Sequence, residues 1–223
     1  GQEFPTGFLL FKISNLFHSQ GEYDNALGYS LQSLKIFEQL GGKYEMGASL
    51  QSIGDCYRYK GEIEKALDYN FRSLKIFEEL DAKAQIANNL FSIGACYYYD
   101  TRNNYTLNQF KAVDYLEKSV KISKEIGLGA RHLIWSTTFL FLSYNNLEIE
   151  YDISEIHRLI EETEKIKYYL NYALYQLIGD HSYLETAYNQ IQELADNLES
   201  DVAAKFLSYP IPKAIVEEWE KVK

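Results

Sequence analysis

The chain has 223 residues, of which 46% are hydrophobic and 24% are charged, and it contains only 3 prolines. This composition is typical of a folded globular protein and excludes a disordered or collagen-like chain. The formal net charge of −10 would repel nucleic-acid phosphates, so we expect no nucleic-acid partner. No apolar stretch approaches the roughly 18 to 20 residues that a membrane span needs, and we therefore expect no membrane association.

Two cysteines, Cys56 and Cys96, are too few for a disulfide framework, and no secretion leader is apparent. We therefore expect a cytoplasmic protein in which both thiols are buried as small hydrophobic side chains. The chain opens with Gly1 rather than methionine, and residues 1–4 resemble a cloning remnant, which indicates a trimmed chain.

The sequence repeats itself at a fixed interval. Residues 12–40 and 52–80 agree at 13 of 29 positions, where chance would give about two. A third copy begins in step, since Ser52–Tyr57 aligns with Ser92–Tyr97, but its second half arrives six residues late. The extra residues therefore lie between Tyr99 and Lys111.

Apolar residues within each repeat recur at helical spacing on both sides of a glycine. In the second repeat Leu50, Ile53 and Tyr57 precede Gly61, and a further apolar run through Leu74 follows it. This spacing predicts a helix, a turn and a second helix in each repeat. A single hairpin cannot bury its apolar face, so we expect the hairpins to stack into a solenoid. No segment shows sustained strand alternation, and the predicted fold class is all-α.

The pattern resembles the tetratricopeptide repeat, in a variant whose repeat has about 40 residues rather than the roughly 34 residues that are usual. Its landmarks in the second repeat are Leu50, Ile53, Gly54, Tyr57, Gly61, Ala66, Tyr69 and Ser73. The resemblance is strong from about residue 8 to residue 124 and implies a right-handed superhelical α-solenoid. We expect about five hairpins, followed by capping helices over residues 201–223. The predicted hairpins span approximately residues 6–44, 45–84, 85–130, 131–167 and 168–200.

No motif predicts an enzyme, a metal site or a cofactor. The four histidines lack the spacing of a zinc site. His157 and Glu161 are four residues apart on one predicted helix face, which is typical of a solvated surface pair. Gly127 and Gly129 lack the strand and third glycine of a dinucleotide motif. The acidic segment 148–164 lacks the glycine turn of a calcium loop. We therefore expect a non-catalytic protein.

The resemblance implies that the first helix of each hairpin lines a concave groove. Aromatic rings supply buried area to a bound peptide, while amide and arginine side chains satisfy its backbone. The candidate peptide-binding residues are Phe8, Phe11, Asn15, His18, Gln51, Asp55, Arg58, Asn88, Phe91, Tyr98 and Tyr99.

One specialisation of the resembled family is a clamp of lysine, asparagine and arginine that grips the C-terminal carboxylate of a chaperone. Of the matching positions only Asn15 fits, so we expect no binding to chaperone tails. The matching positions here are Phe11, Asn15, Ser52, Asn88 and Ser92.

We therefore expect a scaffold that binds a peptide or partner protein on its concave face. One alternative is the sensing or oligomerisation region of a larger signalling protein whose effector domain is absent. Another is self-association through rings exposed at an end of the array. The insertion within Tyr98–Tyr105 is either a recognition loop or a neutral insertion.

Overall fold

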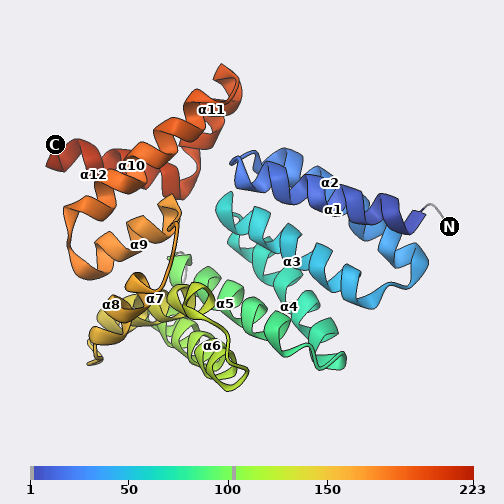
Figure 1. Ribbon diagram of the computed structural model, residues 1–223, viewed down its shortest axis with the longest axis horizontal. Coiled ribbons are helices and arrows are strands. Elements are labelled where there is room, and N and C mark those ends of the chain that lie inside the picture. The colour runs from blue at the N-terminus through green and yellow to red at the C-terminus, as the bar shows by residue number, and fades with distance from the viewer. Residues whose placement is uncertain (1–2, 102–103) are drawn as a thin grey trace.

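The computed structural model describes residues 3–101 and 104–223, which form twelve α-helices and no β-strand (Figure 1). The prediction of an all-α solenoid of stacked hairpins is therefore confirmed. The helices are α1 (Glu3–Ser19), α2 (Tyr23–Leu40), α3 (Lys43–Tyr59), α4 (Ile63–Glu79), α5 (Lys83–Tyr99), α6 (Tyr105–Glu125), α7 (Ala130–Asn146), α8 (Ser154–Glu161), α9 (Tyr168–Ile178), α10 (His181–Asp196), α11 (Ser200–Ser208) and α12 (Pro210–Val222).

The same hydrogen bond joins the two helices of each of the first three hairpins. A buried serine hydroxyl of the second helix donates to a backbone carbonyl of the first helix, and the three carbonyls occupy equivalent positions in successive repeats. Small residues at both partners let the helix backbones approach closely at this crossing. The pairs are Ser33 to Gly7 (2.9 Å), Ser73 to Gly47 (2.7 Å) and Ser119 to Ala87 (2.8 Å).

The residues around this crossing differ in size between repeats in a compensating way. A Cβ atom on Gly47 would lie 2.9 Å from the ring of Phe77, so this position needs glycine. In the third hairpin Ala87 takes the place of glycine, and Ser123 takes the place of the ring. The larger residue on one helix is thus matched by a smaller one on the other, which preserves the packed volume.

Two sequence features fall partly outside the described residues. Residues 1–2 of the predicted cloning remnant lie outside them, whereas Glu3 begins α1 and Phe4 packs edge-on against Phe37 with ring centroids 5.4 Å apart. Residues 102–103 of the predicted insertion also lie outside them. After this gap Asn104 caps α6, because its side chain accepts a hydrogen bond from the backbone N–H of Leu107 at 3.2 Å.

The C-terminal helices return to the turns of the first two hairpins (Figure 1). A Cβ atom on Gly21 would lie 2.6 Å from the ring of Phe206, and one on Gly61 would lie 2.8 Å from Pro210. Both glycines also have positive φ, 82° and 81°. Each turn therefore requires glycine for two reasons: the left-handed backbone conformation and the close approach of α11 or α12.

Charged groups reinforce this contact around Asp24. Its carboxylate pairs with Lys60, at 2.8 Å, and with Lys205 of α11. The hydroxyl of Tyr209 also donates to Asp24 at 3.2 Å. Burial acts to raise the pKa of Asp24, but the hydrogen bonds from the two lysines lower it to about 2. The carboxylate therefore stays charged at neutral pH and joins the two ends of the array.

Tyrosine rings complete the contact between the ends, and we name Tyr23, Tyr59, Tyr168 and Tyr169 the closing cluster. The hydroxyls of Tyr23 and Tyr168 are hydrogen-bonded at 2.6 Å. Tyr23 stacks on Tyr59 with centroids 5.1 Å apart, and Tyr169 packs edge-on against Tyr59 at 5.2 Å. Such ring pairs contribute about 0.5–1.5 kcal/mol beyond their buried area. The closing cluster therefore stabilises the contact of α2 and α3 with α9.

Two further expectations concern single features. Cys56 and Cys96 are buried and free, as predicted. None of the helices in the described part of the chain combines the length and the apolar character that a bilayer crossing would need.

Gly94 and Gly28 provide a test of the tight helix crossings. A Cβ atom on Gly94 would lie 2.6 Å from Leu116 and 3.3 Å from the carbonyl of Ala112, whereas one on Gly28 would meet nothing within 4 Å. We expect Gly94→Ala to lower the free energy of unfolding by about 1–3 kcal/mol. The matched control Gly28→Ala should raise it by up to about 1 kcal/mol, because alanine favours helix. Urea unfolding followed by circular dichroism measures both, and equal changes would contradict the tight crossing.

Candidate functional site

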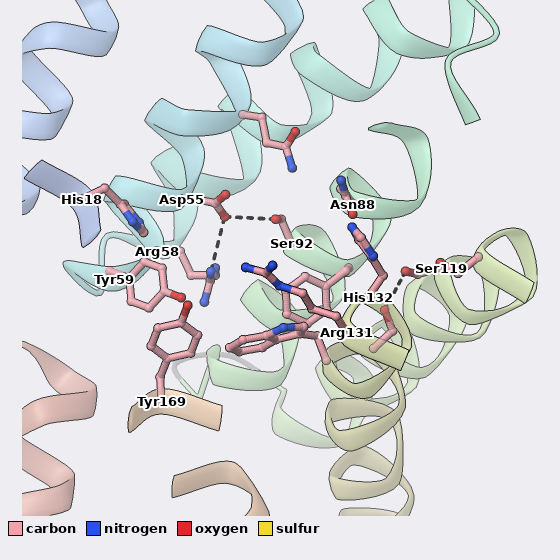
Figure 2. A pocket seen from close by; sticks show the side chains of 15 residues that line it. His18, Asp55, Arg58, Tyr59, Asn88, Ser92, Ser119, Arg131, His132 and Tyr169 are labelled. Carbon is pink, nitrogen blue, oxygen red and sulfur yellow. Dashed lines mark hydrogen bonds and ion pairs between the residues drawn. The ribbon is translucent and has the colours of Figure 1, made fainter. Parts of the chain in front are cut away.

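A cavity of about 310 Å³, which we name the central cavity, lies among the first helices of the first four hairpins (Figure 2). It also touches α6 and α9. Its lining residues are His18 of α1; Gln51, Asp55, Arg58 and Tyr59 of α3; Asn88, Phe91 and Ser92 of α5; Ser119 and Ser123 of α6; Arg131, His132, Trp135 and Ser136 of α7; and Tyr169 of α9.

A second hollow of about 210 Å³ extends the central cavity along α1 and α3. It shares His18, Gln51 and Asp55 with the central cavity and adds Phe11 and Asn15. We name the two hollows together the groove. His18 and Tyr169 also line a third hollow, which lies beside α10.

Eight of the eleven predicted binding residues line the groove. They are Phe11, Asn15, His18, Gln51, Asp55, Arg58, Asn88 and Phe91. Side chains from the first helices of three hairpins therefore lie together, as the resemblance implies. Their role in binding stays a prediction.

The other three predicted residues lie elsewhere. Phe8 is 48% exposed on α1, with the ammonium of Lys12 lying 5.0 Å from its ring centroid. Tyr98 and Tyr99 pack edge-on against Phe139 of α7, with centroids 5.3 Å and 5.7 Å apart. Both tyrosines lie at the end of α5, where α7 covers the face that would otherwise border the groove.

Sequence reasoning missed the contribution of α7 and α9, which supply Arg131, His132, Trp135 and Tyr169. The repeat register is lost after α6, so no landmark pointed to these residues. A weaker signal was present. Trp135 is the sixth residue of α7, as Asn88 is the sixth residue of α5, and counting from the helix start would have found it.

Arg58 is the buried charge of the central cavity, with 8% of its surface exposed. Its Nη2 donates to Asp55 at 3.4 Å, and its guanidinium carbon lies 4.2 Å from the ring centroid of Tyr59. Asp55 also accepts a hydrogen bond from Ser92 at 3.0 Å. The Nε of Arg58 has no partner among the described residues. Asp55 therefore satisfies this guanidinium only in part.

His18 has a buried Nε2 that also lacks a partner among the described residues. Burial lowers the pKa of His18 to about 4, the charges of Arg58 and Lys167 act in the same direction, and Asp55 opposes them. The ring packs edge-on against Tyr59, with centroids 5.0 Å apart. His18 is therefore neutral at pH 7 and contributes an aromatic surface rather than a charge.

Aromatic rings form one wall of the central cavity. Trp135 packs on Tyr169 with centroids 4.7 Å apart, and Phe91 packs edge-on against Trp135 at 6.1 Å. Burial raises the pKa of both Tyr59 and Tyr169. Both hydroxyls therefore remain protonated at neutral pH, and the two side chains are hydrogen-bonded to each other.

The polar side chains of the central cavity are arranged as donors and acceptors rather than as a nucleophile with its base. Ser92 donates to Asp55, and the hydroxyls of Ser119 and Ser136 are hydrogen-bonded to one another at 2.9 Å. Among residues 3–101 and 104–223, no group of three or more histidine, cysteine or acidic side chains could hold a metal ion. Amides, rings and a guanidinium in one hollow suit the binding of a peptide.

Comparison with known proteins agrees with this fold. A family model described as tetratricopeptide repeat matches residues 8–79. The crystal structure of the apo form of RapI is similar to the chain over 100% of its length, with a TM-score of 0.66 and 15% sequence identity, and the chain covers 66% of RapI. At this identity the likeness shows the fold. No curated protein matches the chain.

The depressed pKa of His18 predicts acid sensitivity. Its folded-state pKa of about 4 lies below the ordinary value of 6.5. As the pH falls from about 6.5 to about 4, the unfolded chain binds a proton that the folded chain does not. The free energy of unfolding should therefore fall with pH, by at most about 1.4 kcal/mol per pH unit from this group.

Urea unfolding of the parent, His18→Gln and the surface control His157→Gln at about pH 7.5 and about pH 5 measures this loss. The loss should be smaller in His18→Gln and unchanged in His157→Gln. An equal loss in all three proteins would contradict the assignment to His18.

Proposed function

We propose that this tetratricopeptide-repeat chain is a non-catalytic scaffold that binds a peptide or an extended segment of a partner protein in its groove. The observation that carries the proposal is the groove itself. Its two adjoining hollows combine rings and amides from α1, α3, α5 and α7.

The amide side chains suit the backbone of an extended ligand. Asn15, Gln51 and Asn88 lie on three successive first helices along the groove. Each side chain offers both a donor and an acceptor, as the backbone of a bound peptide requires. Phe11 and Phe91 supply apolar surface beside these amides, so alternate ligand side chains could be buried between the polar contacts.

The scaffold supports binding by holding the groove in one shape. The serine hydrogen bonds fix each hairpin, and the closing cluster joins α2 and α3 to α9 across the array. A preorganised groove loses little conformational entropy on binding, so modest contacts give useful affinity. The two free, buried cysteines favour a cytoplasmic setting for this protein.

A second candidate function is the sensing region of a larger signalling protein. It is favoured by one observation, that the chain covers 66% of RapI, so the similar protein carries more chain than this array. The groove would then receive the signal, and its occupancy would be transmitted to the rest of the protein. Comparing the activity of the full-length gene product with and without a groove-binding peptide tests this candidate.

Selection from a random heptapeptide library tests the binding function, with affinities measured by isothermal titration calorimetry. We expect the double variant Gln51→Ala/Asn88→Ala to bind the selected peptides about tenfold more weakly or worse, because two hydrogen-bonding amides are lost. The control Gln32→Ala, at an exposed site on α2, should bind as the parent does. Selected peptides that bind both variants equally would place binding outside the groove and contradict the proposal.

A further inference from the structure

The central cavity is positively charged although the protein carries a formal net charge of −10. Two guanidinium groups line it, those of Arg58 and Arg131, and Asp55 is the single carboxylate among its lining residues. His18 adds no charge at neutral pH, since burial lowers its pKa to about 4. Two positive charges and one negative charge leave a surplus of one positive charge.

Arg58 is a buried hydrogen-bond donor rather than a surface side chain. It is more than nine-tenths buried, its Nε has no partner among the described residues, and its contact with Asp55 is long at 3.4 Å. A buried donor without a partner is energetically unfavourable. The guanidinium carbon lies 4.2 Å from the ring centroid of Tyr59, and Arg58 lines the central cavity.

Arg131 provides the second donor group from the opposite wall. Figure 2 shows its side chain reaching into the same space as that of Arg58. Within the described ranges Arg131 has neither an ion pair nor a side-chain hydrogen bond. It is the second residue of α7, whose N-cap Gly129 supplies no side-chain acceptor. The partial positive charge of this helix terminus therefore adds to that of Arg131.

We propose that the central cavity binds a carboxylate of the peptide ligand between Arg58 and Arg131. This inference rests on the proposed peptide-binding function and names the ligand's chemistry. A carboxylate matches the planar fork of a guanidinium, and its single negative charge equals the surplus of the cavity. The rings of Phe91 and Trp135 border the same space and would pack against the neighbouring apolar side chain of the ligand.

The donors differ from those of the chaperone-type clamp considered from the sequence. The matching positions lack cations here, but Arg58 lies at the end of α3 and Arg131 at the start of α7. The carboxylate would come either from the C-terminus of the peptide or from an aspartate or glutamate side chain. Both sources present the same group to the cavity, and the probes below distinguish them.

Tryptophan fluorescence gives a direct readout, because the chain has two tryptophans and Trp135 lines the central cavity. In a Trp219→Phe background, Trp135 is the sole tryptophan. The probes are N-acetyl-Ala-Phe with a free carboxylate, its carboxamide, N-acetyl-Asp-Phe carboxamide, and N-acetyl-phosphoserine-Phe carboxamide. Each is titrated into the full chain, and the dissociation constant is taken from the change in emission.

We expect at least one carboxylate probe to bind about tenfold more tightly than the neutral carboxamide. Preference for the first probe identifies a peptide C-terminus, and preference for the aspartate probe identifies an acidic side chain. Arg131→Gln should abolish the preference, and it tests the site without disturbing the buried Arg58. The control Arg72→Gln, whose exposed side chain pairs with Asp68 on α4, should keep it.

Equal binding of the acid and carboxamide probes would overturn the inference but leave the groove as a peptide site. Tightest binding of the phosphoserine probe, or a carboxylate preference that survives Arg131→Gln, would also overturn it. If no probe changes the emission of Trp135, the inference fails. The library selection then decides independently whether the groove binds peptides at all.

Discussion

The crossing of the two helices within each hairpin is the constraint on which the rest of the structure depends. A serine hydroxyl that reaches the facing backbone carbonyl requires the helices to approach closely, and Gly7, Gly47 and Ala87 permit this approach. Because the same geometry recurs in each of the first three repeats, successive first helices are presented in register. These crossings therefore hold in place the helices that carry the side chains of the groove.

The C-terminal helices return to this stack and pack on its first two turns. Gly21 and Gly61 occupy equivalent positions in successive repeats, and each has left-handed backbone and receives a bulky group from α11 or α12. The turns thus serve two purposes at once. They connect helices within the repeats, and they provide the surface on which the end of the chain packs.

The sequence predicts the first three hairpins well because their glycine, alanine and aromatic landmarks repeat, and local packing alone decides them. Eight groove residues follow from the resemblance to the tetratricopeptide repeat, which assigns the first helix of each hairpin to the groove. The insertion and the loss of register after α6 remove the landmarks, so the repeat pattern does not extend to Arg131 and Trp135. The first-helix face that the resemblance implies also includes Tyr98 and Tyr99, yet α7 packs over both. Contacts between distant segments, such as Phe206 with Gly21, leave no local pattern to read.

Two of the polar defects of the fold lie where the proposed function needs them. Of the five buried side-chain atoms without a partner among the described residues, two belong to His18 and Arg58, and both residues line the central cavity. A chain selected for stability alone would replace a half-satisfied buried guanidinium with an apolar group, since such replacements are often neutral or stabilising. Retaining Arg58 beside an unpaired Arg131 is understandable if a ligand carboxylate completes the hydrogen bonds that the protein leaves open. Binding would then relieve an electrostatic cost already present in the empty cavity, and the affinity would come as much from that relief as from new contacts.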